Sequence, residues 1–388
     1  MKPSNKPTYD AIVIGLGSMG ASALCHLADR GLGVLGIDRF HPPHTMGSHG
    51  GQSRIIRKAY FEHPDYIPLL QKAYDSWNHL EARSGEHIYL ETGVLYAASK
   101  GHPLLRQIEH SASLYDIPLA SLSPLEASDR FPPFSFPPHF EVLFEPEAGL
   151  IRPEVAISAY LKEARRAGAN IHTDEKVMEW KPMGEGVEVK TDKSTYYARR
   201  LVLSAGPWTM NLLPAAKPHL NVTRQVLAWY DPIDSDLLKL GKFPCWFIAE
   251  EGDAGAYYGF PILPKEMGGP LGLKLAYHHP GRSTSADAVD RNIVAEDVLH
   301  LESILRKYLP ASAPRLSEAS TCLYSNTPDE HFVIDLLPGM EDRVCMAWGF
   351  SGHGFKFVSV VGEILSDLAT EGRTDHPIGF LSASRFSG

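Results

Sequence analysis

The chain has 388 residues, a formal net charge of −9 at pH 7 and a hydrophobic fraction of 44%. This length allows two domains, and the apolar content is that of an ordinary globular protein. The negative charge argues against nucleic acid or an anionic membrane surface as the main partner, because both attract cationic faces. No apolar run approaches the length of a membrane span, about 18 residues, and residues 1–10 lack the apolar core of a signal peptide.

The cysteines give a prediction about the cellular compartment. Cys25, Cys245, Cys322 and Cys345 lie far apart, and none forms a C-x-x-C pair. This spacing favours reduced thiols over a disulfide framework, and it shows no metal-binding pattern. We therefore expect a cytoplasmic protein with no metal site.

The first forty residues predict a βαβ unit. A short apolar strand over residues 11–14 runs into a glycine turn, a helical pattern covers 21–28, and a second apolar strand covers 34–37. An apolar run that ends in glycines and is followed by a helical period is typical of a strand, turn and helix.

The turn between this strand and helix carries a dinucleotide fingerprint. Gly15, Gly17 and Gly20 form G-x-G-x-x-G, and Asp38 ends the second strand. The glycines allow a tight turn, a close approach of the backbone to a pyrophosphate, and close packing of helix on strand. The helix N-terminus favours the anion, and the carboxylate can bind ribose hydroxyls. The sequence therefore predicts a dinucleotide site.

The spacing of the glycines does not distinguish FAD from NAD, but two other features favour FAD. The fingerprint begins almost at the N-terminus, and no second fingerprint marks a separate nicotinamide domain. A later strand over 196–203 ends in the small residues 204–206, which can pass close to another part of the same cofactor.

The remaining chain mixes helices with an antiparallel sheet. We expect an extended loop over 41–58 and irregular structure over 120–140, where prolines are dense. Alternation over 223–278 predicts antiparallel strands. Helical patterns occur at 66–80 and 295–310, and at 152–173 a helical pattern leads into a strand. The last pattern, at 343–369, is that of a strand, a turn and a helix.

Nucleotide-type signals therefore occur at both ends of the chain and in its middle. We predict an α/β fold in which a Rossmann-type FAD-binding domain is interleaved with a β-sheet-rich substrate domain. The FAD-binding domain is expected to comprise residues 1–89, 150–220 and 329–388. The substrate domain is expected to comprise residues 90–149 and 221–328.

Three later stretches carry a more specific signal. They are GSHGGQSRIIRKAY at 47–60, YYGFP with GLKLAYH within 257–278, and GFSGHGFKF at 349–357. With the fingerprint and the stretch around Cys322, they resemble the family of monomeric sarcosine oxidase and N-methyltryptophan oxidase. The similarity runs in order over essentially the whole chain. It implies an FAD-dependent oxidase that demethylates an N-methyl amino acid, releases formaldehyde and reduces dioxygen to hydrogen peroxide.

The resemblance also implies that FAD is bound covalently through its 8α-methyl group to the sulfur of Cys322. A thiol can form such a bond beside a fixed ring and positive charge. From its surroundings in the sequence alone, Cys322 is read by default as a small buried core residue. The other residues predicted to bind the cofactor are Gly15, Gly17, Ser18, Met19, Gly20, Asp38, Arg39, His49, Ser53, Val177, Gly206, Tyr324, Gly352, His353 and Gly354.

Basic residues in the glycine-rich loops match the substrate-binding positions of the family. The resemblance implies that Arg57 and Lys356 bind the substrate carboxylate, for which the fork of a guanidinium is well suited. It places Arg54 near the flavin and Phe247 beside the substrate side chain. Arg54 and Arg57, three apart, can otherwise be a solvated or salt-bridged pair.

A third set of residues matches the catalytic positions. Lys274 stands between two leucines on a predicted strand, so its side chain points away from them. The resemblance places it at the flavin N5 side, where a fixed cation promotes the reaction with dioxygen. Tyr258 and His278 match positions around the substrate amine. An outward-facing lysine is the alternative for Lys274.

Departures from the family pattern leave the preferred substrate open. Gly50 replaces a histidine, Trp348 replaces a small residue, and Phe247 adds aromatic bulk, so we expect a pocket of altered shape. We expect the enzyme to be a monomer. Its expected substrates are a small secondary amine that bears a carboxylate, and dioxygen. Sarcosine, N-methyltryptophan, pipecolate, a glycated amino acid and another cyclic amine remain candidates. A flavin dehydrogenase with a quinone or protein acceptor, and a non-catalytic flavin-binding subunit, are further alternatives.

Overall fold

The structure is a computed structural model that describes residues 9–252, 255–279, 281–312 and 315–386. Residues 1–8, which belong to the stretch expected to lack a signal peptide, lie outside the described part of the chain. In the described ranges, no helix combines the length and the apolar character that a membrane crossing requires.

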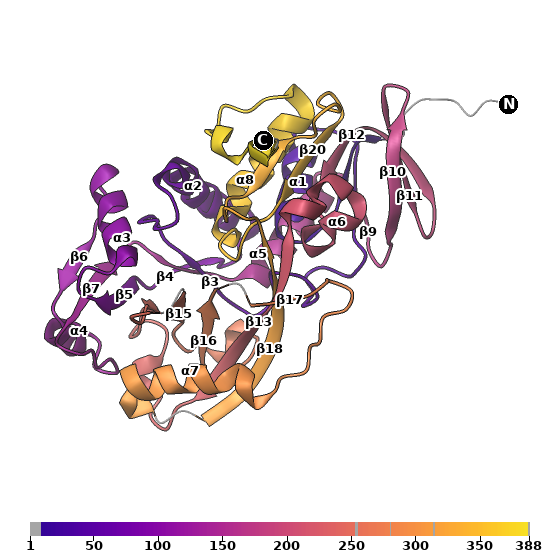
Figure 1. The fold of residues 1–388 in the computed structure, drawn as a ribbon. Coiled ribbons are helices and arrows are strands. Elements are labelled where there is room, and N and C mark those ends of the chain that lie inside the picture. The colour runs from indigo at the N-terminus through magenta and orange to yellow at the C-terminus, as the bar shows by residue number, and fades with distance from the viewer. Residues whose placement is uncertain (1–8, 253–254, 280, 313–314, 387–388) are drawn as a thin grey trace.

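The first large sheet is built on the predicted βαβ unit (Figure 1). Its path is β10-β11-β12-β1-β2-β9; β20 pairs with β12, and β19 pairs with β20. Strands β9, β2, β1, β12 and β20 are parallel, as a dinucleotide-binding sheet requires. The strands are β1 (Tyr9–Ile14), β2 (Val34–Ile37), β9 (Asn170–His172), β10 (Val177–Met183), β11 (Gly186–Thr191), β12 (Thr195–Leu203), β19 (Val333–Leu336) and β20 (Val344–Trp348).

Helices α1 (Ser18–Asp29), α5 (Pro153–Arg166) and α8 (Val358–Glu371) pack together beside this sheet, and α2 (Ile67–Ser84) packs on α8. Gly362 makes the close approach of α8 to α1 possible, because a Cβ there would come within 2.0 Å of Ser22 Oγ. The helices therefore hold the fingerprint turn against the sheet from one side.

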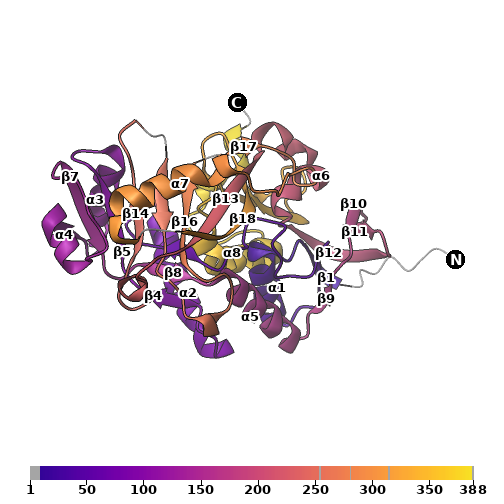
Figure 2. The same ribbon diagram turned by 90° about the horizontal axis from the view of Figure 1, so that it is seen from below.

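The second large sheet follows the path β17-β13-β16-β15-β14-β5-β7-β6, and β18 pairs with β13. The long antiparallel β13–β18 pair runs from this sheet toward the first one (Figure 1). Helix α7 (Ala295–Tyr308) lies across β13 and β16 (Figure 2). The strands are β5 (Val94–Ser99), β6 (Ala120–Leu122), β7 (Phe140–Glu145), β13 (Asn221–Asp231), β14 (Cys245–Ile248), β15 (Ala256–Gly259), β16 (Leu273–His278), β17 (Arg282–Ser283) and β18 (Arg315–Asn326).

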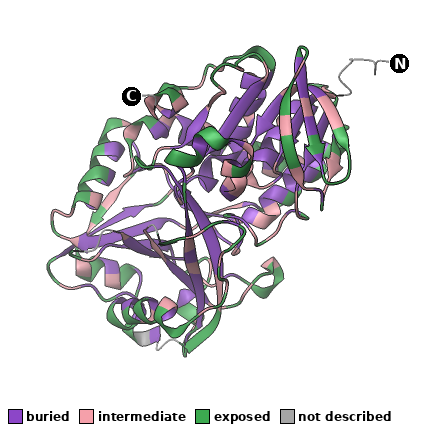
Figure 3. Cartoon of the chain, turned by 45° about the vertical axis from the view of Figure 1, so that its right-hand side comes forward, coloured by how far each residue is buried: buried purple, intermediate pink, exposed green. Residues whose placement is uncertain are grey.

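A third, small sheet is formed by strands that occur in the chain between strands of the two large sheets. It consists of β3 (Arg54–Ile56), β8 (Gly149–Ile151) and β4 (Tyr89–Glu91). The remaining helices are α3 (Pro103–Leu114), α4 (Pro124–Arg130) and α6 (Thr209–Leu212). Most strands of the two large sheets are buried, whereas the β10–β11 hairpin and the outer faces of the helices carry exposed residues (Figure 3).

Most of the predicted elements are confirmed, and two expectations hold over only part of their range. The loop predicted over 41–58 contains strand β3, whose backbone pairs with β8. The irregular stretch predicted over 120–140 contains β6 and the helix α4. Ser123 accepts a hydrogen bond from Glu126 N–H, and Glu126 accepts one from Ser123 N–H. This capping box, with Pro124 in the first turn, starts a helix despite the surrounding prolines.

The two large sheets take their strands from alternating parts of the chain. The strands of the first sheet lie within 9–37, 170–203 and 333–348, and those of the second lie within 94–145 and 221–326. The arrangement agrees with an interleaved α/β fold. The exact division at residues 89, 149, 220 and 328 stays a proposal.

Candidate active site

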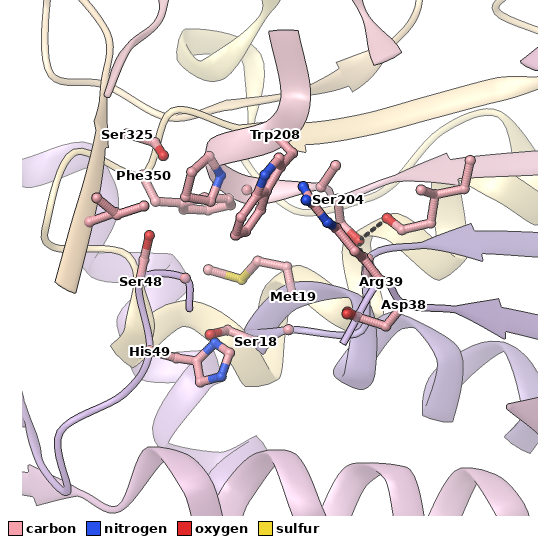
Figure 4. Close-up of a pocket in the computed structure, with 18 of the residues that line it drawn as sticks. Ser18, Met19, Asp38, Arg39, Ser48, His49, Ser204, Trp208, Ser325 and Phe350 are labelled. Carbon is pink, nitrogen blue, oxygen red and sulfur yellow. Dashed lines mark hydrogen bonds between the residues drawn. The ribbon is translucent and has the colours of Figure 1, made fainter. Parts of the chain in front are cut away.

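A cavity of about 300 Å³ lies where β1, β2 and β12 end (Figure 4). Such a position, at the carboxyl ends of parallel strands, is where open α/β sheets bind ligands. The predicted cofactor residues that line it are Gly15, Gly17, Ser18, Met19, Asp38, Arg39, His49, Val177, Gly206, Tyr324, Gly352 and Gly354.

The fingerprint turn fits a phosphate-binding role by its packing. Gly15 has φ +88°, and a Cβ there would lie 2.6 Å from Ser204 O. A Cβ on Gly20 would lie 1.8 Å from Gly15 O, so both positions require glycine. Ser204 Oγ donates to Ile14 O (3.1 Å) and Gly15 O (2.9 Å) and fixes the turn (Figure 4). The first turn of α1 therefore opens toward the cavity, where its free amides favour an anion.

Asp38 and Arg39 extend this lining from the end of β2. The buried Asp38 carboxylate accepts hydrogen bonds from Leu16 N–H (2.6 Å) and Phe40 N–H (2.8 Å). The carboxylate therefore links the glycine turn to the end of the strand. Its remaining lone pairs can still accept a hydrogen bond from a ribose hydroxyl. Arg39 is ion-paired with Asp287 and lies over the ring of Phe40.

Four predicted cofactor residues do not line this cavity. Gly20 lies beneath the turn, and His353 lines a second cavity described below. Ser53 Oγ instead accepts a hydrogen bond from Lys274 Nζ (3.1 Å). Cys322 is buried on β18 two residues before Tyr324, and side chains at this spacing share one face of a strand.

A second cavity, of about 40 Å³, adjoins the first and collects the predicted substrate residues. The two cavities share Arg54, Tyr324, Gly352 and Phe355. The predicted residues found only in the second are Arg57, Phe247, Tyr258, His278, His353 and Lys356. Residues from five distant parts of the chain therefore meet at one small space beside the cofactor cavity.

Arg57 is buried and only partly paired. Its Nη2 donates to both carboxylate oxygens of Glu62 (2.8 and 2.6 Å), and its Nη1 donates to Ala59 O (3.1 Å). Its Nε has no hydrogen-bond partner among the described residues. The guanidinium lies 3.8 Å from the ring centre of Phe61 and 4.4 Å from that of Tyr60. A buried, rigidly held cation with an unpaired donor is suited to an incoming anion.

Lys356 supplies a second buried cation. Its Nζ donates to His353 O (2.7 Å), which leaves protons available for a ligand within the described part of the site. Burial, aided by the neighbouring Arg57, lowers the pKa of Lys356 to about 7, and Glu62 opposes this shift. Burial also lowers the pKa of His353 to about 3, so that imidazole is neutral at pH 7.

Glu62 is a residue of this site that the sequence analysis missed. Burial alone would raise its pKa, but Arg57, His353 and Lys356 outweigh burial and lower it to about 2. Glu62 is therefore ionised, and it already accepts hydrogen bonds from one nitrogen of the Arg57 guanidinium. An acid five residues after Arg57, next to two aromatic residues, was the only signal for it in the sequence.

Tyr324, His278 and Tyr258 form a cluster of neutral polar groups in the lining of the small cavity. The Tyr324 hydroxyl and His278 Nδ1 lie 3.3 Å apart. Burial lowers the pKa of His278 to about 4, and burial raises the pKa of both tyrosines. Near pH 7 the cluster therefore offers hydrogen bonds without charge.

Lys274 lies behind Arg54 and is fully buried. Its Nζ donates to Gly51 O, Ser53 O (2.7 Å) and Ser53 Oγ, and it lies 4.5 Å from the ring centre of Phe260. Its neighbours Leu273 and Leu275 pack in a core cluster that does not contain the ring of Phe260. The prediction that Lys274 points away from these leucines is therefore confirmed. Burial, with Arg54, lowers the pKa of Lys274 well below its ordinary value.

The loop that Lys274 holds is fixed from its other side by Glu154. The carboxylate accepts hydrogen bonds from Gly51 N–H (2.8 Å) and Gln52 N–H (3.1 Å). Both residues have positive φ, +105° and +72°. The turn therefore directs its carbonyls toward the ammonium and its amides toward the carboxylate.

The three departures expected to reshape the pocket lie in different surroundings. Phe247 lines the second cavity, as expected. Gly50 lies against Thr45, where a Cβ would meet the threonine at 3.2 Å. Trp348 is not among the lining residues of these two cavities; it is buried on β20 and stacks on Phe386, so its ring packs in the core. The described residues also include no group of three or more metal-ligating side chains.

Comparisons with known proteins place the chain in a family. The family model described as FAD dependent oxidoreductase matches residues 10–368. Monomeric sarcosine oxidase of Streptomyces avermitilis is 39% identical over 387 residues, which is 98% of each chain. N-methyl-L-tryptophan oxidase of Yersinia pestis is 35% identical over 380 residues, covering 97% of this chain and 99% of the relative.

Among solved structures, the fold is similar to that of NikD, described as an unusual amino acid oxidase essential for nikkomycin biosynthesis, in its open form. The TM-score is 0.85 at 25% identity, covering 97% of this chain and 98% of NikD. The structure of L-proline dehydrogenase from P. horikoshii has a TM-score of 0.82 at 20% identity and supports the fold alone. The fingerprint turn, the cavity it borders and these matches together show that the chain belongs to the FAD dependent oxidoreductase family, alongside the monomeric sarcosine oxidases and N-methyl-L-tryptophan oxidases.

Proposed function

We propose that this enzyme is an FAD-dependent oxidase that demethylates an N-methyl amino acid such as sarcosine. The observation that carries the proposal is the pair of buried cations, Arg57 and Lys356, in a small cavity that opens on the cofactor cavity. The named activities of the relatives support the same reaction class. The net reaction consumes the amine, dioxygen and water, and yields the primary amino acid, formaldehyde and hydrogen peroxide.

The cofactor cavity has the features that FAD requires. The amides of the first turn of α1 would hold the pyrophosphate, and Asp38 would bind the adenosine ribose. Tyr324, Gly352 and Arg54, which line both cavities, would border the flavin ring. When bound, FAD supplies the two-electron oxidation of the amine and passes these electrons to dioxygen.

The substrate carboxylate is proposed to bind Arg57 and Lys356. The unpaired Nε of Arg57 and the remaining protons of Lys356 are donors for it. Because Glu62 already accepts two hydrogen bonds from Arg57, the incoming carboxylate shares or replaces that contact. Phe247 would lie beside the substrate side chain, with Tyr258 and His278 around the amine.

Oxidation requires an uncharged amine, because the nitrogen lone pair takes part. Arg54, Arg57 and Lys356 raise the local positive potential and favour loss of the amine proton, whereas Glu62 opposes them. Lys274 is proposed to favour the reaction with dioxygen, since a fixed cation stabilises the negative charge that develops on oxygen. No catalytic base is assigned.

We further propose that Cys322 is joined to the flavin. Of the four buried cysteines, Cys322 has the most cationic surroundings: burial raises its pKa, but Arg54, Lys274 and Arg291 all act to lower it. The net reaction joins the sulfur to the methyl carbon and removes two hydrogen atoms, which dioxygen takes up as hydrogen peroxide. Nearby cations favour the thiolate that this reaction needs.

The proposed activity is tested by following oxygen uptake with sarcosine, N-methyl-L-tryptophan and L-pipecolate in air. An N-methyl substrate should consume one dioxygen for each formaldehyde and each hydrogen peroxide formed. Bleaching of the flavin without peroxide in air would instead indicate a dehydrogenase with another acceptor. A flavin that none of these amines bleaches would contradict the proposal.

The pKa of Lys356 gives a prediction of pH dependence. An anion favours the charged lysine, so its binding should be strongest below pH 7 and weaken as the pH rises through that pKa. We expect the Kd of propionate, which has no amine to titrate, to rise about tenfold between pH 6 and pH 9. The change in flavin absorbance measures it.

A Lys356→Met variant is the control for this titration. It should bind propionate weakly at every pH and lose the dependence around pH 7. If the variant keeps the full pH dependence, another group is responsible.

A further inference from the structure

A third cavity, of about 420 Å³, lies next to the small cavity and is roughly ten times larger. The two share Glu62, His278 and Tyr324. Residues of α3, of the stretch 255–279 and of the loop after β18 complete its walls. The small cavity can hold little more than an N-methyl group and a carboxylate, so any longer arm of a substrate must extend past these three residues.

The lining of this third cavity is rich in acidic residues. Among the described residues that line it, histidines apart, the ionisable side chains are those of Glu62, Asp329 and Glu330. Its histidines are His102, His278, His279 and His331. Burial lowers the pKa of His102, His278 and His331, so these three are neutral near pH 7. Any net charge that these lining residues contribute is therefore negative, and it favours a cation over an anion.

Two of the three carboxylates are already paired. Glu62 is bonded to Arg57, and Asp329 is bonded to Arg385. Glu330 makes no ion pair with the described residues, and its side chain is exposed. Its backbone is fixed: Glu330 O accepts a hydrogen bond from His353 Nε2 (3.0 Å), and its φ is +61°. Glu330 is thus an acidic residue at the wall of the third cavity that forms no ion pair with the described residues.

We propose that this third cavity receives the side chain of the substrate, and that it selects an extended arm carrying a positive charge. The proposal rests on the proposed function, because the same small cavity must hold the carboxylate and the N-methyl group. It assigns to this enzyme an N-methyl amino acid with a long basic side chain, in preference to sarcosine. Glu330 would be the specificity-determining residue, acting on the arm and not on the reacting atoms.

The binding test uses three carboxylates without an α-amine: 6-aminohexanoate, hexanoate and adipate. All three can anchor on Arg57 and Lys356, but their arms end in a cation, a methyl group and an anion. The Kd of each is measured on the holoenzyme from the change in flavin absorbance. We expect 6-aminohexanoate to bind about fivefold more tightly than hexanoate, and adipate to bind most weakly, since one exposed charge pair has an effect of this size.

The Glu330→Gln variant should remove most of the difference between 6-aminohexanoate and hexanoate and leave hexanoate unchanged. Glu185→Gln is the matched control, because it removes the same charge from the exposed turn of the β10–β11 hairpin, far from α3 (Figures 1 and 2). It should keep the full preference. In turnover, Nα-methyl-L-lysine should then have a higher kcat/KM than N-methyl-L-norleucine, and that ratio should fall in Glu330→Gln.

Three outcomes are separable in this experiment. Failure of all three carboxylates to perturb the flavin would contradict the carboxylate site of the proposed function. Equal binding of the three, or tightest binding of hexanoate or adipate, would overturn the proposal for the third cavity while leaving the proposed function intact. Equal loss of preference in Glu185→Gln would show that the overall charge of the protein, and not Glu330, causes the effect.

Discussion

Replacement of Lys274 by methionine is expected to slow reoxidation of the reduced flavin by dioxygen about 100-fold or more. Removing one fixed group that stabilises developing negative charge typically costs this much. Reduction of the flavin by substrate under anaerobic conditions should change much less, because Lys274 donates to the loop and lies outside the small cavity. Stopped-flow absorbance measures the two steps separately.

The same residue predicts a pH dependence for the reaction with dioxygen. Burial lowers the pKa of Lys274, so its charge is lost as the pH rises through that lowered value. Reoxidation of the wild-type enzyme should slow with rising pH, and that dependence should be absent in Lys274→Met.

A control variant and a contrary outcome complete this prediction. The Glu154→Gln variant keeps the lysine but weakens the other side of its loop, so it should retain most of the oxygen reactivity. A Lys274→Met enzyme that reoxidises normally but is reduced slowly would refute the proposed role.

Replacement of Cys322 by serine should leave the flavin removable by acid. A hydroxyl is a much weaker nucleophile than a thiolate at neutral pH, so the bond to the cofactor should not form. After acid precipitation, the yellow colour should stay with the wild-type pellet and move to the supernatant in the variant.

Cys345→Ser is the matched control for this test. Cys345 is equally buried, and its thiol donates to Leu365 O, a contact that serine can replace. Its flavin should stay with the pellet. Colour that stays in the Cys322→Ser pellet, or that leaves the Cys345→Ser pellet, would contradict the assignment of Cys322.

The sequence predicted the parts of the site that local patterns determine. The fingerprint turn and Asp38 lie in a short motif whose spacing follows from backbone geometry, whereas the roles of the paired basic residues came from the family resemblance. The structure brings Arg57, Lys356, Phe247, Tyr258 and His278 to one cavity, as the resemblance implied. Strand alternation alone gave the direction of Lys274.

Other features could not be read from the sequence, because they depend on contacts between distant segments. Glu62 belongs to the site only because the loop after β3 folds back on Arg57. Nothing in the composition near Trp348 indicates that its ring packs against Phe386 and not into the pocket. Helix α4 was hidden by prolines, although Ser123 and Glu126 carried the capping signal. The acid-rich third cavity unites residues from several separate stretches, and no single stretch is unusual.

The most direct test of the account is anaerobic titration of the purified yellow protein with sarcosine and with Nα-methyl-L-lysine, followed by admission of air. The flavin absorbance is expected to bleach with an N-methyl amino acid and to return in air, with one hydrogen peroxide formed for each cycle. A colourless protein, or a flavin that neither amine bleaches, would contradict the central claim that this chain is a flavin oxidase of N-methyl amino acids.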